Sequence, residues 1–462
     1  MNKSFVYTLL FGLFVFWGSL FSQTKDSHKT FINKIYSEAL VKTPTHKLLK
    51  ELTTKFPHRL SGSKGADGAV KWTKQVMQDF GFDNVFLQDV MVEHWERGEK
   101  EQAYIVDKNG NKVEFSILAL GRSISTPESG ITAEVVKVQS LDEVAELGRE
   151  KIEGKIVFYN RSFEHKHLRT FSGYVGTVNQ RTKGPSQAAR YGAIAVVIRS
   201  VSSGDDDFPH TGTLGYAKDA PQIPAGALGN HSANKLAEIL ESNPQQKLFL
   251  KINSQTLPDA KSYNVIGEIK GSEHPEKIIA VGGHLDAWDV GQGAHDDGSG
   301  CMQSISALKI LQRMGYKPKH TLRAVMFINE ENGLRGGKTY ADSAVNKKEK
   351  HIIAIESDAG GFTPRAFGLK GPDSTLAKMQ EWLKYFPDYT IESIKKGYGG
   401  PDINPLNKAD GTPTIGLVPD SQRYFDFHHS PADVFSAVNK RELELGTASM
   451  ATLIYLVDQF GL

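Results

Sequence analysis

The chain has 462 residues, which is too long for one ordinary domain and favours two domains or one large domain with an insertion. Hydrophobic residues make up 39% of it and charged residues 23%, so it can bury a sizeable core and is not predominantly disordered. The formal net charge of +2 gives no reason to expect a nucleic acid or an acidic lipid as partner.

The first residues have the pattern of an export signal. Lys3 gives a positive start, residues 5–21 are almost wholly apolar, and Ser22-Gln23 is a plausible cleavage point. The alternative is an uncleaved anchor, but the apolar run is short for a full membrane span and polar residues follow at once. We therefore expect a signal peptide over residues 1–22, and a mature chain that is secreted or lies in the periplasm or cell envelope without a membrane span.

The mature chain has one cysteine, Cys301, so it contains no internal disulfide. An exported protein of this kind must be stabilised by its core and by any metal that it binds. We interpret Cys301 as a small core residue at the start of a helix and not as a nucleophile.

The first part of the mature chain alternates between helix and strand patterns. Residues 28–56 are typical of one or two amphipathic helices, and residues 66–80 of a further helix that Gly81 ends. Residues 85–92 alternate like a strand. A second strand-rich stretch, residues 103–118, contains Asn109-Gly110, a hairpin turn signal.

Residues 126–251 have a different sequence pattern, with short apolar runs between polar loops, and are predicted to form a small, separate, β-rich unit. Short buried strands are expected at residues 156–159 and 193–198, with a helix at residues 186–191 between them. Proline-bearing segments at Thr126-Pro127 and at residues 256–258 are typical of insertion boundaries.

From Tyr263 onward strands and helices alternate. Buried strands are predicted at residues 277–281 and 322–328, with a helix at residues 300–314 between them. Residues 352–355 and 414–417 are further candidate strands. This pattern predicts an α/β fold with a mostly parallel sheet covered by helices on both faces, and sites in such folds form at the carboxyl ends of strands.

A histidine and an aspartate directly follow the first of these strands. His284 and Asp286 alternate with Leu285, so they share a face if the segment stays extended. His284 would then be a metal ligand, and Asp286 could accept its second ring proton. The alternative for this segment alone is a solvated loop.

Two adjacent carboxylates, Asp296 and Asp297, stand in a Gly-rich turn before a helix. Their mutual repulsion is costly unless a cation offsets it, and one bridging carboxylate can hold two metal ions. The alternative is helix capping by Asp297 or Ser299. We expect both roles, with Asp296 on metal and Asp297 structural.

Further acids and a histidine follow other apolar runs. Glu330 and Glu331 end the strand at residues 322–328, where one could serve as ligand and the other as base, although a solvated strand end is the alternative. Asp358 and His429 are further ligand candidates, in segments that taken singly could be ordinary polar loops. Carboxylate and imidazole ligands suit zinc, with manganese or cobalt left open.

Together these segments resemble one family, the two-zinc aminopeptidases and glutamate carboxypeptidases. The resemblance rests on the order and spacing of five motifs: Gly-Gly-His-Leu-Asp at 282–286, Asp-Asp-Gly-Ser-Gly at 296–300, Asn-Glu-Glu at 329–331, Ser-Asp at 357–358 and His-Ser-x-x-Asp at 429–433. It implies a zinc-peptidase domain formed by residues 23–125 and 257–462. A protease-associated insertion, residues 126–256, would interrupt this domain.

The resemblance also implies two Zn²⁺ per chain and a set of ligands. His284 and Asp358 would hold one ion, Glu331 and His429 the other, and Asp296 would bridge them. His428 competes with His429, but the His-Ser-x-x-Asp spacing favours His429.

Three further roles follow from the resemblance. Glu330 matches the general base, and Asp286 matches the partner of His284. Tyr398 resembles a tyrosine that contacts the transition state in related aminopeptidases, although it could equally be a packed loop aromatic.

The activity implied is hydrolysis of dipeptides or short peptides with free termini, with the insertion lying over the metal cleft. In this arrangement the loop at residues 209–212 could contact a substrate terminus. An aminopeptidase acting on longer peptides is the main alternative, because the metal site is shared. A single-zinc acyl transferase like the glutaminyl cyclases, and a non-catalytic relative, fit less well because all five ligands and the base are present. The resemblance also allows a homodimer.

Overall fold

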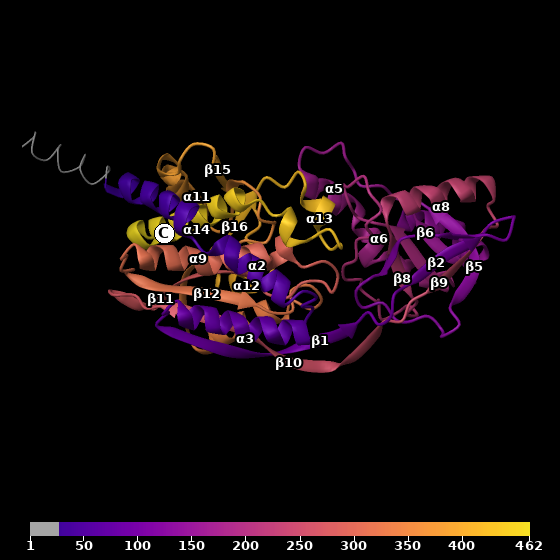
Figure 1. The fold of residues 1–462 in the computed structure, drawn as a ribbon, viewed down its shortest axis with the longest axis horizontal. Helices are drawn as coiled ribbons and strands as arrows, with labels where there is room; N and C mark the ends of the chain where they lie inside the picture. Colours follow the sequence, from indigo (N-terminus) through magenta and orange to yellow (C-terminus); the bar gives the residue numbers. More distant parts are fainter. Residues whose placement is uncertain (1–26) are drawn as a thin grey trace, which may run out of the picture.

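The structure is a computed structural model that describes residues 27–462. The predicted signal peptide at residues 1–22 lies outside the described residues. Among the described helices, none is both long enough and apolar enough to cross a membrane. The chain forms two units side by side, each built on its own sheet (Figure 1).

The first unit contains an eight-stranded mixed sheet. Its strands, in spatial order, are β1 (Asn84–Glu96), β10 (Gln255–Ile269), β12 (His320–Phe327), β11 (His274–His284), β13 (Lys350–Glu356), β16 (Thr414–Pro419), β14 (Pro364–Lys370) and β15 (Ser393–Lys396). The central strands β12, β11, β13 and β16 are parallel. Antiparallel pairs occur toward the edges, where β10 joins β12 and β14 joins β16. The predicted α/β class is confirmed, with the parallel part at the centre.

Helices cover both faces of this sheet. In β11, Ile279 and Val281 pack into the large core on one face, whereas Ile278 and Ala280 pack into the core on the other. The large core contains a helix at residues 27–42, α2 (Thr45–Lys55), α3 (Lys64–Asp79), α9 (Ser299–Arg313), α11 (Asp373–Gln380) and α14 (Lys440–Phe460). The opposite core contains α10 (Arg335–Asn346) and α12 (Asn404–Asp410). Burial on both faces explains why the central strands are continuous apolar runs.

The second unit has a sheet of eight shorter strands. In spatial order they are β3 (Lys112–Glu114), β2 (Gln102–Val106), β9 (Lys247–Lys251), β5 (Ile131–Val138), β6 (Ile156–Tyr159), β7 (Ala195–Arg199), β8 (Ala225–Leu228) and β4 (Ile117–Ala119). Its helices are α4 (Leu141–Ile152), α5 (Thr170–Thr177), α6 (Asn179–Thr182), α7 (Gly184–Arg190) and α8 (Asn230–Ser242). Two further hydrophobic cores lie against this sheet, and one of them also includes Leu60, Trp95 and Trp288 of the first unit.

The second sheet begins earlier in the chain than expected. Strands β2, β3 and β4 lie within residues 102–119, which we had assigned to the first part of the catalytic domain, yet they pair with β9 and β8 of the second sheet. Alternation in sequence identifies a strand but does not show which sheet it joins. The second unit therefore includes residues before 126.

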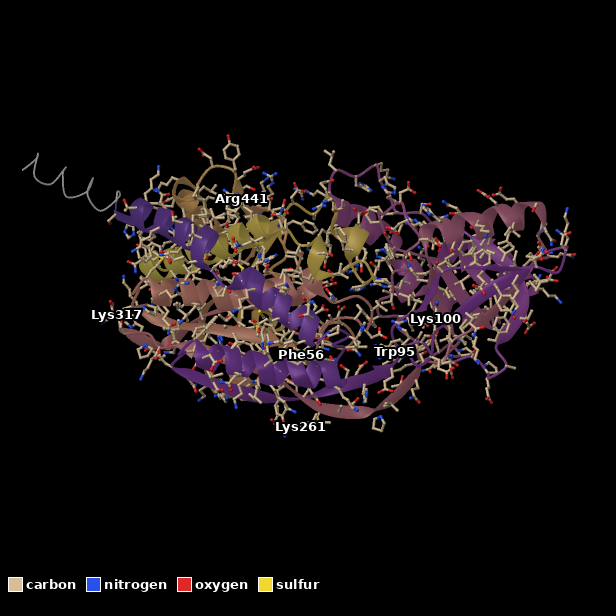
Figure 2. The ribbon with its side chains drawn as sticks, in the orientation of Figure 1. Phe56, Trp95, Lys100, Lys261, Lys317 and Arg441 are labelled. Atoms are coloured by element: carbon tan, nitrogen blue, oxygen red, sulfur yellow. The ribbon has the colours of Figure 1, made fainter. Side chains whose placement is uncertain are left out.

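A long two-stranded ribbon links the two units. β1 and β10 pair from Asn84 with Glu268 to Glu96 with Gln255. At the end of the ribbon Trp95 is buried, donates Nε1–H to the carbonyl of Ser123 at 3.0 Å, and lies where the units meet (Figure 2). The ribbon and this buried contact fix the second unit beside the loops at the carboxyl ends of the central strands.

Candidate metal centre

The five predicted ligands converge at one edge of the first sheet. His284 is the last residue of β11, Glu331 follows β12, and Asp358 follows β13. These strands are parallel neighbours, so their carboxyl ends meet there. Asp296 comes from η1 (Ala294–Gly298), the turn before α9, and His429 follows α13 (Tyr424–Phe427).

Asp296 lies between the two histidines. Its Oδ1 is 3.2 Å from His284 Nε2, and its Oδ2 is 3.3 Å from His429 Nε2. Asp358 Oδ1 lies 3.3 Å from His284 Nε2, and Glu331 Oε2 lies 3.1 Å from His429 Nε2. The side chains thus form two groups of three that share Asp296, the arrangement that two bridged metal ions require.

His428 lies beside this centre. Its Nε2 is 3.7 Å from Asp296 Oδ2, and its ring stacks on that of His429 with centroids 3.5 Å apart. The ligand atoms of Asp296, His428 and His429 lie close enough to share one cation. Only His429, however, also contacts Glu331. This contact favours His429 over His428 as the fifth ligand.

The buried carboxylates at this edge are suited to binding cations. Burial and the charges of Asp358 and Glu331 raise the pKa of Glu330 well above its usual range, and burial also raises the pKa of Glu331. Burial opposes ionisation of Asp296, but His284 and His429 hold its pKa well below the usual value. Asp296 Oδ2 and Glu331 Oε1 are buried without a hydrogen-bond donor. Such orphaned oxygens beside imidazole nitrogens are a donor set that fits zinc.

Asp286 has a different contact from the one predicted. The Nδ1 of His284 lies 2.9 Å from the backbone carbonyl oxygen of Asp286, not from its carboxylate. The carboxylate instead accepts the backbone N–H groups of Glu330 and Glu331, at 3.1 and 3.3 Å. β11 ends at His284, so the alternation of an extended strand no longer applies two residues later. Asp286 therefore joins the loop after β11 to the loop after β12.

Three residues hold the loops of the predicted ligands, although sequence reasoning assigned them little or no functional role. Arg59 is fully buried and donates to the carbonyls of Leu285, Gln292 and Gly293, which fixes the loop between His284 and Asp296. No sequence pattern indicated this role, because Arg59 lies in a Gly- and Ser-rich loop.

The other two are Asp297 and Asp433. Asp433 accepts the backbone N–H of Asp296 at 3.1 Å, and the His-Ser-x-x-Asp motif could have signalled this role. Asp297 accepts the N–H of Gly300 at 2.9 Å and that of His284 at 3.1 Å. It therefore caps the first turn of α9, as the sequence predicted, and also holds the backbone of His284, a predicted ligand.

A cavity of about 1350 Å³ opens over the centre and is lined by both units. The first unit contributes Glu330, Tyr398 and the predicted ligands Asp296, Glu331, Asp358 and His429. The second unit contributes residues of α5 and α6 and Thr213. Tyr398 is 58% exposed, so it is not the packed loop aromatic that the sequence left open.

The loop at residues 209–212 does not meet the cavity as expected. His210 is buried, its Nδ1 lies 2.6 Å from the carbonyl oxygen of His428, and burial lowers its pKa to about 3. Thr211 donates its backbone N–H to the carbonyl of His429 at 2.9 Å. The hydroxyl of Thr213 donates to the carbonyl of Glu331 at 2.6 Å. The loop and Thr213 directly after it therefore hold the backbone of two predicted ligands, His429 and Glu331.

Comparison with known proteins places the chain in a family. Residues 264–454 match the family model described as Peptidase family M28. Carboxypeptidase Q of Bos taurus is 36% identical over 433 residues, which are 94% of this chain and 89% of that protein. The chain belongs to peptidase family M28. The predicted family is thus confirmed, and the chain is a metallopeptidase.

Solved structures share the architecture. The crystal structure of a peptidase M28 precursor from Shewanella amazonensis SB2B has a TM-score of 0.89 and 31% sequence identity, and the match covers 94% of this chain and 97% of that one. A zinc aminopeptidase from Bacillus subtilis has a TM-score of 0.63 at 18% identity, covering 89% of this chain and 93% of that one, and so shows the fold alone. The whole described fold, including the second unit, is therefore one that M28 peptidases adopt.

Proposed function

We propose that this M28 peptidase is a zinc-dependent exopeptidase that hydrolyses dipeptides or short peptides with free termini. The observation that carries the proposal is the position of Asp296, within 3.3 Å of both His284 Nε2 and His429 Nε2. In the proposed site His284 and Asp358 would hold one ion, Glu331 and His429 would hold the other, and Asp296 would be shared between them. When bound, zinc ions supply Lewis acidity that polarises a carbonyl and lowers the pKa of a water molecule.

Three residues near the proposed ions would carry out proton transfer, positioning of the base and stabilisation of the transition state. Glu330 lines the cavity and is not needed as a ligand, whereas Glu356, another such carboxylate in the lining, accepts the backbone N–H groups of Asp402 and Ile403. We therefore propose that Glu330 takes a proton from the attacking water and returns it to the leaving amine. Asp286 fixes the backbone of Glu330 and so aims its side chain. Tyr398, exposed in the same cavity, is proposed to donate a hydrogen bond to the oxygen that gains charge in the transition state.

The second unit is proposed to be a protease-associated insertion that limits substrate length. Its residues form one wall of the cavity, and the β1–β10 ribbon and the buried Trp95 hold it in place. A wall fixed in this way would exclude long chains by steric contact. The name carboxypeptidase Q, borne by relatives at 36% identity, supports an exopeptidase that requires a free C-terminus.

Two further properties stay proposals. The apolar N-terminal segment supports export and cleavage after residue 22. A homodimer is compatible with the family resemblance and can be measured by light scattering on the purified chain. Neither property is needed for the chemistry above.

The proposed activity is tested with a panel of peptides. We would measure kcat/KM for a dipeptide, its N-acetylated form, a tripeptide and a hexapeptide with the same first two residues, with and without a chelator. The proposal requires chelator-sensitive turnover in which the free dipeptide exceeds the hexapeptide clearly. A hexapeptide cleaved from its N-terminus at a comparable rate would instead establish the aminopeptidase alternative.

A further inference from the structure

We infer that Arg181, on α6 of the second unit, binds the free C-terminal carboxylate of the substrate. The inference rests on the proposed exopeptidase function and names the residue that would give it its requirement for a free C-terminus. Arg181 is a cationic side chain in the cavity wall, and it has no part in the proposed metal centre.

Arg181 is buried without a full set of partners. It lines the cavity, yet only 7% of its surface is exposed. Its Nη2 donates to the hydroxyl of Tyr174 at 2.7 Å, and its Nη1 reaches the carbonyl of Thr211 at 3.4 Å. Its Nε has no acceptor, and no carboxylate of the described residues forms an ion pair with it. A buried charge is costly until an anion and hydrogen bonds compensate it.

A second buried arginine in the same unit, Arg199, has hydrogen-bond acceptors for all its guanidinium nitrogens. Arg199 is also 7% exposed and also lacks a carboxylate partner. Its three guanidinium nitrogens, however, donate to the side chains of Asn160 and Asn234 and to the carbonyl of Asn230. Arg199 does not line the cavity. The unmet hydrogen-bonding capacity of Arg181 is therefore particular to its place beside the metal centre.

The guanidinium lies close to the proposed site of cleavage. A methyl group built on Gly212 would stand 2.5 Å from Arg181 Nη1 and 2.6 Å from His429 Nδ1, so the two side chains flank one glycine. One extended residue spans at most about 3.6 Å. A carboxylate held at Arg181 thus fits the C-terminus of a substrate whose scissile carbonyl, one residue earlier, lies at the metal centre.

The neighbouring groups are suited to a carboxylate. The hydroxyl of Tyr174 accepts from Arg181 and keeps its own proton for donation into the cavity, which it also lines. Among the described arginines and lysines that line the cavity, Arg181 alone is buried. Arg122 already pairs with Glu93 at 3.1 Å. A desolvated guanidinium with a hydroxyl beside it discriminates an anion from a neutral amide more strongly than an exposed charge does.

The test compares two substrates on three proteins. The substrates are a free dipeptide and the same dipeptide amidated at its C-terminus, and the proteins are the zinc-loaded wild type, Arg181→Met and Arg199→Met. We expect wild type to prefer the free dipeptide and Arg181→Met to reduce that preference by about 10- to 100-fold, chiefly through KM. Turnover of the amidated dipeptide should change little, which also shows that the variant is folded. Arg199→Met should keep the wild-type preference, and Arg181→Lys should recover part of it.

The outcomes separate this inference from the proposed function. If wild type prefers the free dipeptide and Arg181→Met keeps that preference, the carboxylate binds elsewhere and only the inference falls. If Arg181→Met slows both substrates equally, its role is structural and the inference is likewise overturned. If wild type does not distinguish the two substrates, the requirement for a free C-terminus is itself wrong, and the proposed function falls with the inference.

Discussion

The carboxylate of Asp286 accepts the backbone N–H of Glu330 at 3.1 Å, while the backbone carbonyl of Asp286 lies 2.9 Å from the Nδ1 of His284. One residue therefore contacts a predicted metal ligand through its main chain and the proposed general base through its side chain. Because these contacts use different atoms, substitution of the side chain can separate the two roles.

Asp286→Asn should lower kcat/KM by about 10- to 100-fold, since an amide offers one acceptor where two backbone N–H groups require two. Zinc content should fall less than activity, because the carbonyl that faces His284 remains. Steady-state kinetics and metal analysis check this. Ser61→Ala is the control and should have the smaller effect, since it removes a hydroxyl that donates to Asp286 at 3.1 Å and accepts from Asn329 at 3.3 Å but leaves both acceptors of Asp286 in place. Wild-type kinetics in Asp286→Asn would remove Asp286 from the positioning role.

Glu330→Gln should lose about 10²–10⁴ in kcat while it keeps both metal ions. The reason is that the amide cannot accept the proton of the attacking water, whereas no ligand is removed. The matched control is Glu331→Gln, one residue away, which should lose activity together with metal from one site. Turnover near the wild-type rate in Glu330→Gln would show that the base is another group.

Asp296→Asn should lose metal from both sites, whereas His284→Ala should empty mainly one. A shared ligand serves two ions, and Asp296 is within 3.3 Å of both histidine Nε2 atoms. Metal counting on the purified variants, at equal free zinc, decides this. Equal stoichiometry in the two variants would exclude Asp296 as the bridge.

Removal of metal should lower the thermal stability of the protein. Without cations the buried carboxylates repel one another, and a ligand that binds the folded state at 100 times its Kd stabilises it by about 2.7 kcal/mol. Differential scanning calorimetry should therefore show a lower Tm after chelation and recovery when zinc is added. Asp296→Asn serves as the control, since its Tm should respond less to zinc. An unchanged Tm after complete removal of metal would contradict a buried ionic centre.

Arg59→Met should lower the free energy of unfolding by about 3–5 kcal/mol, because three buried carbonyls lose their donors. Denaturant unfolding measures the change. Arg313→Met is the comparison, since that arginine also donates to a carbonyl, of Lys42, but at an exposed position. If both substitutions have equally small effects, the hydrogen bonds of Arg59 do not hold the loop.

The sequence by itself determined the candidate ligands, their order and the sheet edge at which they meet. These follow from local patterns, because an acid or histidine after an apolar strand must lie at the strand's carboxyl end. The same local logic predicted that Asp297 caps α9, a contact that spans only three residues.

Only the tertiary structure decided contacts between distant segments. It assigned β2, β3 and β4 to the second sheet, turned His210 toward the backbone of His428, and left the Nε of Arg181 without an acceptor in the cavity wall. It also showed that the side chain of Asp286 faces Glu330. Periodicity reports which face of an element is buried, but not which other element covers it. Partners more than forty residues away, as Glu330 is from Asp286, are therefore fixed by packing of the whole chain.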